Sequence, residues 1–154
     1  MAKDLKAREI MTTEVVTVSP DDDVEKVARL LLEHHISGLP VVDGDGKLVG
    51  VITEGDLIFQ EKKIRAPLYT VILDTVIYLE KPQRFVDELK RTVAQKVGEL
   101  MSTRLYTVGP DASVEDIATI MVEKSINRVP VVDSDNKLVG IVSRQDIIRA
   151  IHGK

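Results

Sequence analysis

Pro40-Val41-Val42-Asp43 returns ninety positions later as Pro130-Val131-Val132-Asp133, and this recurrence decides how the chain is organised. Around it, residues 6–58 align with residues 96–148 without a gap, and 24 of the 53 aligned pairs are identical. Many of the other pairs are conservative exchanges. Self-similarity that keeps prolines, turns and acids in register over this length indicates a duplicated structural unit.

Each copy predicts the element order β-α-β-β-α. β-Branched runs favour strands, apolar residues at a spacing of three or four favour a helix with one buried face, and a short Asp/Gly cluster favours a hairpin turn. In the first copy these are a strand at 15–18, a helix from 24 that ends near His34 and His35, strands at 40–42 and 48–53 around a turn at 43–46, and a helix capped by Thr53.

The segment between the copies has no counterpart in the repeat. Apolar residues at a strict spacing of four follow Pro82, namely Phe85, Leu89, Val93 and Val97, and they predict a helix. We therefore expect three parts: a first repeat over 1–59, an inserted helical segment over 60–95, and a second repeat over 96–154.

Composition excludes several classes of protein. The 154 residues carry a formal charge of −4 and include no cysteine and only five aromatic residues. The absence of cysteine excludes disulfides, thiolate metal sites and a cysteine nucleophile. The acidic balance and the few aromatic rings argue against a nucleic-acid binder. We expect a cytoplasmic protein without a membrane segment, because the sequence has neither a signal-peptide pattern nor a long uncharged apolar run.

No pattern of residues predicts a metal site or a catalytic centre. The loop at 43–54 resembles a calcium-binding loop only in part, because it lacks the glycine and several oxygen ligands that such a loop needs. The three histidines, His34, His35 and His152, have no carboxylates at a metal-ligand spacing around them. We therefore expect a protein that is not an enzyme.

The informative motif is a hydroxyl at the end of a strand followed three residues later by an aspartate. It occurs as Thr53 with Asp56 and as Ser143 with Asp146. A carboxylate accepts two hydrogen bonds, which suits the 2′ and 3′ hydroxyls of a ribose. The alternative is a simple helix-capping arrangement, which the same residues also favour.

With these motifs the chain resembles a tandem pair of CBS domains, also called a Bateman module. The resemblance covers residues 6–58 and 96–148, and it rests on the duplication, the Pro-Val-Val-Asp strands, the Gly-x-x-Thr/Ser-x-x-Asp segments, and the pair Ile10-Met11-Thr12 and Leu100-Met101-Ser102. It implies an α/β fold in which two β-α-β-β-α units pack as a pseudo-two-fold disc.

The resemblance also implies two clefts that bind adenosine-containing ligands, each combining one repeat's Thr/Ser-x-x-Asp motif with the other repeat's first strand and pre-proline segment. Cleft one would use Thr53, Asp56, Ser102, Leu105, Tyr106, Ile126, Asn127 and Arg128. Cleft two would use Ser143, Arg144, Asp146, Thr12, Val15, Val16, Ile36, Ser37 and Gly38.

The two clefts differ in charge on this assignment. Arg128 would serve as a phosphate contact in cleft one, where Tyr106 would flank the purine and Glu54 would oppose a polyphosphate. In cleft two Gly38 replaces that arginine and leaves Arg144 and His35 as the basic candidates. AMP or ADP is therefore expected before ATP.

The expected function is a regulatory sensor with an adenine nucleotide as its ligand and no required cofactor. We expect a homodimer and an unidentified downstream protein partner. Two alternatives remain open: an interaction or assembly module with vestigial clefts, and a receptor for another adenosyl ligand such as S-adenosylmethionine, NAD or a cyclic dinucleotide.

Overall fold

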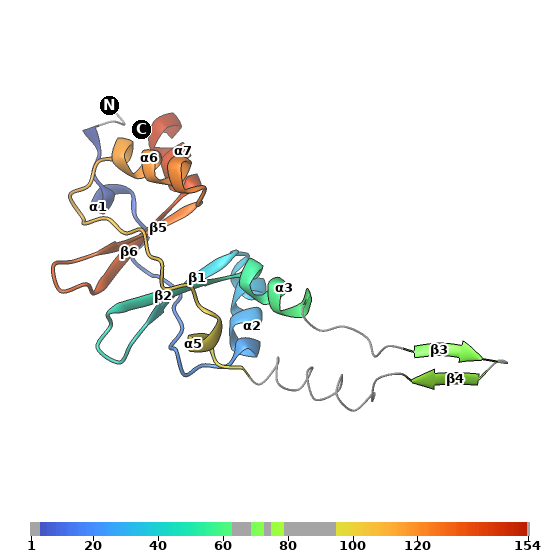
Figure 1. The fold of residues 1–154 in the computed structure, drawn as a ribbon. Coiled ribbons are helices and arrows are strands. Elements are labelled where there is room, and N and C mark those ends of the chain that lie inside the picture. The colour runs from blue at the N-terminus through green and yellow to red at the C-terminus, as the bar shows by residue number, and fades with distance from the viewer. Residues whose placement is uncertain (1–3, 63–68, 73–74, 79–94, 154) are drawn as a thin grey trace. The chain divides into compact units, whose positions relative to one another are not determined.

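The computed structural model describes residues 4–62, 69–72, 75–78 and 95–153 (Figure 1). The two repeats have the same order of elements, so the predicted duplication of the fold is confirmed. The first repeat contains α1 (Ala7–Ile10), α2 (Val24–His34), β1 (Gly38–Val42), β2 (Leu48–Thr53) and α3 (Glu54–Lys62). The second contains α5 (Val97–Leu100), α6 (Val114–Lys124), β5 (Arg128–Val132), β6 (Leu138–Ser143) and α7 (Arg144–Gly153).

The chain folds into two compact units that do not coincide with the two repeats. One unit comprises Met1–Ser19, Pro40–Val51 and Ser102–Lys154, and the other comprises Pro20–Leu39 and Ile52–Met101. We call them the first unit and the second unit. The first unit thus combines α1 with α6 and α7 of the other repeat, whereas the second unit combines α5 with α2 and α3.

The short helices α1 and α5 had no signal in the sequence analysis, and main-chain hydrogen bonds to the other repeat hold them. In the first unit, the Ala7 amide donates to the Ala112 carbonyl at 2.8 Å. In the second unit, the Val97 amide donates to the Asp22 carbonyl at 2.8 Å. The opening segment of each repeat is therefore exchanged with the other repeat.

The long helices begin and end as their sequences predict. Asp23 caps α2 by accepting a hydrogen bond from the Lys26 amide at 2.9 Å, and Ser113 caps α6 by accepting one from the Asp116 amide at 3.0 Å. His35, at the end of α2, has a left-handed backbone with φ of 54°. Residue 125, its counterpart after α6, has the same φ. Both helices therefore stop at the same place in the repeat.

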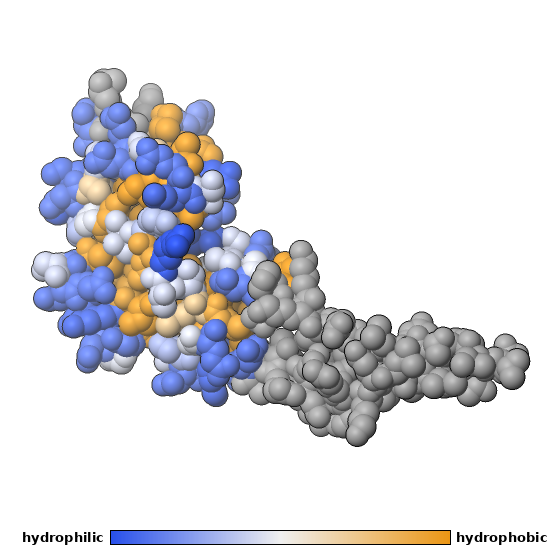
Figure 2. All heavy atoms as spheres, in the orientation of Figure 1, coloured by the Kyte–Doolittle hydropathy of each residue, from blue (hydrophilic) through white to orange (hydrophobic). Residues whose placement is uncertain are grey.

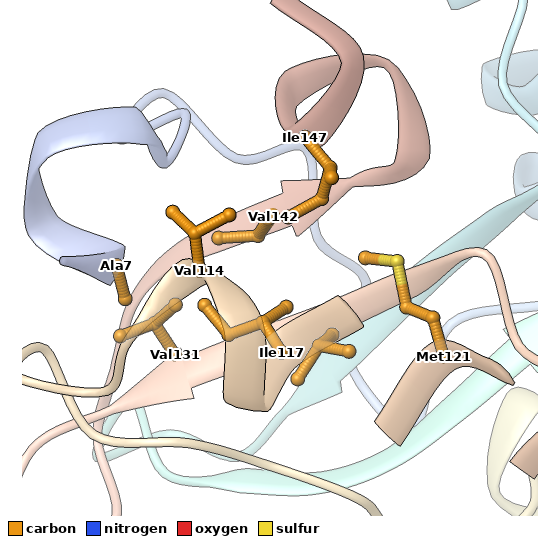
Figure 3. Packing of buried hydrophobic residues seen from close by; sticks show 8 residues of the cluster. Ala7, Val114, Ile117, Met121, Val131, Val142 and Ile147 are labelled. Carbon is orange, nitrogen blue, oxygen red and sulfur yellow. The ribbon is translucent and has the colours of Figure 1, made fainter. Parts of the chain in front are cut away.

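A buried cluster of aliphatic side chains forms the core of the first unit. Figure 3 shows Ala7 from α1 and Ile147 from α7 converging with residues of α6 and of the β5–β6 hairpin. The buried members are Ala7, Val114, Ile117, Met121, Val129, Val131, Val142 and Ile147. Because α7 begins directly after β6, this packing fixes the orientation of the turn between them.

The predicted first strand and the predicted helical insertion both differ from the structure. Residues 15–18 form no regular strand, because only Val18 makes a bridge, parallel to Val41. Within the insertion, β3 (Tyr69–Ile72) and β4 (Thr75–Tyr78) pair as antiparallel strands. Threonine, valine, isoleucine and tyrosine dominate both strands, and their strand preference overrides a helical assignment there. The helix predicted around Phe85–Val93 lies outside the described residues.

Candidate functional site

The Ser143 motif, residues 143–146, lies in the first unit where β6 passes into α7. The Oδ2 atom of Asp146 accepts hydrogen bonds from the Ser143 amide at 2.8 Å and from the Ser143 hydroxyl at 3.0 Å. The Asp146 amide in turn donates to the Ser143 Oγ at 3.3 Å. These bonds hold the aspartate carboxylate against the end of the strand, with the side chain of Asp146 only 6% exposed.

The Thr53 motif, residues 53–56, repeats this arrangement in the second unit. The Oδ2 atom of Asp56 accepts from the Thr53 amide at 2.8 Å and from the Thr53 hydroxyl at 3.2 Å. The Asp56 amide lies 3.4 Å from the Thr53 Oγ. The capping arrangement is therefore present in both repeats, and it leaves Oδ1 as the oxygen directed away from the capping group.

The two aspartates differ in what contacts Oδ1. Arg149 lies one helical turn after Asp146, and its Nη2 atom approaches the Asp146 Oδ1 at 3.2 Å. The counterpart of Arg149 in the first repeat is Phe59, which carries no charge. Sequence reasoning missed Arg149, although a spacing of three residues from an acid on a helix is a recognised signal for an ion pair.

The pre-proline segments lie beside the motif of their own repeat. The Arg144 amide donates to the Asn127 carbonyl at 2.9 Å, and Arg128 is paired with Ser143 in the β5–β6 ladder. In the second unit the Glu54 amide donates to the Ser37 carbonyl at 2.9 Å. The sequence analysis grouped each segment with the opposite motif. An antiparallel hairpin brings the start of its first strand to the end of its second, and this explains the observed grouping.

This placement changes how the basic residues are divided between the Ser143 motif and the Thr53 motif. Within the first unit, Arg128 lies beside the Ser143 motif, which already contains Arg144, and its expected role at the Thr53 motif stays a prediction. Gly38 opens β1 in the first repeat and is buried. The positive groups therefore gather at one motif, where the sequence analysis divided them between two.

The opening segments of the repeats lie beside the second strand of the other repeat's hairpin. Thr12 and Ile141 exchange main-chain hydrogen bonds of 2.9 and 3.0 Å, two residues before Ser143. Ser102 and Val51 exchange bonds of 2.8 and 3.0 Å in the same way. The structure thus brings Thr12 close to the Ser143 motif, and its role in a ligand cleft stays a prediction.

The other residues named from sequence are partly buried. They are Val15, Val16, Ile36, Leu105, Tyr106 and Ile126. Ile126 packs against the core of the first unit. The Lys124 ammonium lies 5.2 Å from the centre of the Tyr106 ring, so a cation–π contact occupies this aromatic ring. Tyr106 therefore has a structural partner that the sequence analysis did not anticipate.

Within residues 4–62, 69–72, 75–78 and 95–153, no group of three or more His, Cys, Asp or Glu side chains converges to hold a metal ion. The helices in these ranges are all too short or too polar to cross a bilayer.

A family model described as "CBS domain" matches residues 7–62 and 97–153. Protein MJ1426 of Methanocaldococcus jannaschii is 34% identical over 151 residues, with 94% of this chain and 89% of that protein aligned. The chloroplastic CBS domain-containing protein CBSX1 of Arabidopsis thaliana is also 34% identical, over 86% of this chain. The chain spans only 57% of CBSX1 and 23% of an aligned inosine-5′-monophosphate dehydrogenase.

Solved structures agree with the sequence comparisons. The crystal structure of CBSX2 in complex with AMP has a TM-score of 0.73 at 28% identity, with 95% of each chain aligned. The CBS domain pair of protein MJ0100, in complex with 5′-methylthioadenosine and S-adenosyl-L-methionine, has a TM-score of 0.68 at 27% identity, with 97% of each chain aligned. Because CBSX1 is named as chloroplastic, a cytoplasmic location for this chain stays a prediction. The duplicated fold, the two family matches and these structural likenesses agree, and the chain belongs to the CBS domain family as a tandem CBS pair.

Proposed function

We propose that this chain is a non-catalytic regulatory module that binds adenosine-containing ligands at the Ser143 and Thr53 motifs. The observation that carries the proposal is the fixed carboxylate present in both repeats. In each motif, the strand-ending residue directs two hydrogen bonds to Oδ2 of the aspartate. A carboxylate oriented in this way is suited to accept hydrogen bonds from a ribose diol.

The likeness to CBS pairs bound to AMP, to 5′-methylthioadenosine and to S-adenosyl-L-methionine supports this ligand class. A ligand that favours one arrangement of the chain shifts its population by the difference between its affinities for the two arrangements. Regulation then needs no chemical step by this chain.

Isothermal titration calorimetry tests the proposal with AMP, ADP, ATP, NAD, S-adenosylmethionine and 5′-methylthioadenosine as probes. At least one probe should bind more tightly than about 1 mM, which corresponds to about −4.1 kcal/mol. Asp146→Asn and Asp56→Asn should each remove one binding event, because the amide replaces a charged acceptor with a neutral one. Failure of every probe to bind at 1 mM would falsify the proposed function.

A second candidate function, assembly through a helix face, is favoured by the exposed aliphatic residues. Val122 on α6 is 80% exposed, and Ile148 and Ile151 on α7 are also exposed. Figure 2 shows apolar surface where α6 and α7 reach the outside. The counterparts Leu32 and Ile58 are exposed in the other repeat as well. A homodimer through such faces should become monomeric in the Val122→Glu/Ile148→Glu variant, as measured by light scattering.

A further inference from the structure

The two motifs have the same backbone geometry but opposite charge. Superposing the repeats by ninety positions pairs Gly38 with Arg128, Glu54 with Arg144, and Phe59 with Arg149. The second repeat therefore has arginine at three positions that accompany its aspartate. The first repeat places a second carboxylate beside its aspartate and no cation at these positions. The two repeats thus differ at positions beside the aspartate, whereas the aspartate itself is present in both.

The structure places all three arginines at the Ser143 motif within the first unit. Arg149 forms an ion pair with Asp146, with Nη2 and Oδ1 3.2 Å apart. Arg128 faces Ser143 across the β5–β6 ladder. Arg144 is the first residue of α7, and its exposed side chain follows the hydroxyl-bearing residue directly. Guanidinium groups form paired, charge-assisted hydrogen bonds to phosphate, so this arrangement favours an anionic ligand.

At the Thr53 motif, the sequence positions equivalent to the three arginines carry no cation. Glu54 occupies the place of Arg144, and its amide makes the equivalent bond, 2.9 Å to the Ser37 carbonyl. The backbone bond is therefore the same, while the exposed side chain at this position has the opposite charge. A phosphate next to Glu54 and Asp56 would be repelled, whereas a neutral or cationic adenosyl group would not.

We propose that the two motifs sort adenosyl ligands by charge. The Ser143 motif takes phosphorylated adenosyl ligands, and the Thr53 motif takes adenosyl ligands without a phosphate, neutral or cationic. This inference rests on the proposed function, because it assumes that both aspartates hold a ribose. It adds that a single chain responds to two chemically different metabolite classes at once.

Calorimetry with two probes tests the sorting: AMP for the phosphorylated class and 5′-methylthioadenosine for the class without phosphate. Asp146→Asn should abolish AMP binding and leave 5′-methylthioadenosine binding intact, and Asp56→Asn should do the reverse. Raising the salt concentration from 50 to 500 mM should weaken AMP binding more than binding of the uncharged probe, because salt screens the arginine–phosphate attraction.

A matched pair of charge-reversal variants, at positions 144 and 54, tests whether these charges cause the sorting. Arg144→Glu should weaken AMP binding at least tenfold without changing 5′-methylthioadenosine binding. The reciprocal change, Glu54→Arg, should create measurable AMP binding at the Thr53 motif in the Asp146→Asn background, where AMP otherwise does not bind. Both side chains are exposed, and circular dichroism will check that the variants keep the fold.

Three outcomes separate the two proposals. If AMP binding depends on Asp56, or if both motifs bind both probes with the same preference, the sorting is overturned while the proposed function stands. If neither exchange at positions 54 and 144 alters AMP binding, the charge explanation is likewise overturned. If no probe binds at 1 mM, the proposed function fails and the sorting fails with it.

Discussion

Gln95 places a polar side chain where the fold has an apolar one in the other repeat. The main-chain carbonyl of Gln95 accepts a hydrogen bond from the Val24 amide at 3.1 Å. The main-chain carbonyl of Leu5 accepts one from the Val114 amide at the same distance, 3.1 Å. Leu5 packs against the core of the first unit. The Gln95 Oε1 atom is buried, and no group in the described part of the chain donates a hydrogen bond to it.

Replacing Gln95 with leucine should therefore stabilise the protein. A buried acceptor without a partner costs about 1–3 kcal/mol, and part of this cost disappears when an apolar side chain takes its place. We expect Gln95→Leu to raise the free energy of unfolding by about 1 kcal/mol. Urea denaturation followed by circular dichroism measures the change. The reciprocal variant Leu5→Gln is the control and should destabilise the protein, and a loss of stability in Gln95→Leu would contradict the explanation.

Gly140 is required by the close approach of the opening segment to β6. A Cβ atom at this position would overlap the side chain of Met11 and lie 3.1 Å from the Thr12 carbonyl oxygen. Thr12 is held there by its bonds to Ile141. A methyl group therefore requires the Met11 side chain to take another position and the Thr12 carbonyl to shift by a few tenths of an ångström.

Gly140→Ala should lower stability by about 1–3 kcal/mol, the usual cost of overpacking. It should also weaken ligand binding at the Ser143 motif, because Thr12 would be displaced. Thermal unfolding and AMP calorimetry measure the two effects. Gly109→Ala is a suitable control, since a Cβ there has no heavy atom within 4 Å. Equal stability of the two variants would show that the approach at Gly140 is not tight.

At the scale of elements, the two hairpin turns bind each other within the first unit. The Leu48 amide donates to the Asn136 carbonyl at 3.0 Å, and the Leu138 amide donates to the Gly46 carbonyl at 3.2 Å. Asn136 adds a bond from its side-chain Nδ2 to the Leu48 carbonyl at 3.0 Å, although its φ is +65°. Asparagine tolerates this left-handed backbone better than most residues do.

The two substitutions at Asn136 should therefore differ in cost. Asn136→Ala loses the side-chain bond and also strains the backbone, and it should cost about 2 kcal/mol. Asn136→Gly reproduces Gly46, keeps the backbone relaxed and should cost about 1 kcal/mol or less. Chemical denaturation of both variants gives the comparison. A greater loss for glycine than for alanine would mean that backbone strain is not the dominant cost.

Local patterns predicted the elements whose stability is local. The helices α2 and α6, their caps, and the Asp43 turn follow from apolar spacing and from side chains that bond to nearby amides, such as Asp43 Oδ1 to the Lys47 amide at 3.0 Å. The hydroxyl-to-aspartate bond in each motif was likewise local. The four-residue helices α1 and α5 could not be predicted, because bonds to the other repeat hold them.

Two further features follow from hairpin patterns that the sequence analysis did not use. The position of Arg128 beside Ser143 was predictable, because the two ends of an antiparallel hairpin must meet. The family resemblance groups Arg128 with the Thr53 motif as well, and that grouping stays a prediction. The β3–β4 hairpin was also predictable from its β-branched residues. The sequence analysis instead assigned the whole insertion as helical.

For the molecule as a whole, the exchange of opening segments makes each repeat incomplete by itself. Ala7 from the first repeat is fully buried in a core otherwise formed by the second repeat. Val97 from the second repeat is fully buried, and its amide is bonded to the Asp22 carbonyl. A repeat of about 60 residues is only marginally stable by itself, so losing one of its helices should prevent independent folding.

Two separate peptides, residues 4–62 and 95–153, test this exchange. Each peptide alone should lack a cooperative urea transition, and an equimolar mixture should regain one, because each supplies the opening helix that the other needs. Circular dichroism follows the folding, and light scattering identifies a heterodimer. A peptide of residues 20–62, without α1, is the control and should not restore the transition, since Ala7 is then missing from the core. A cooperative transition in either peptide as a monomer would show that the exchanged helices are dispensable for folding.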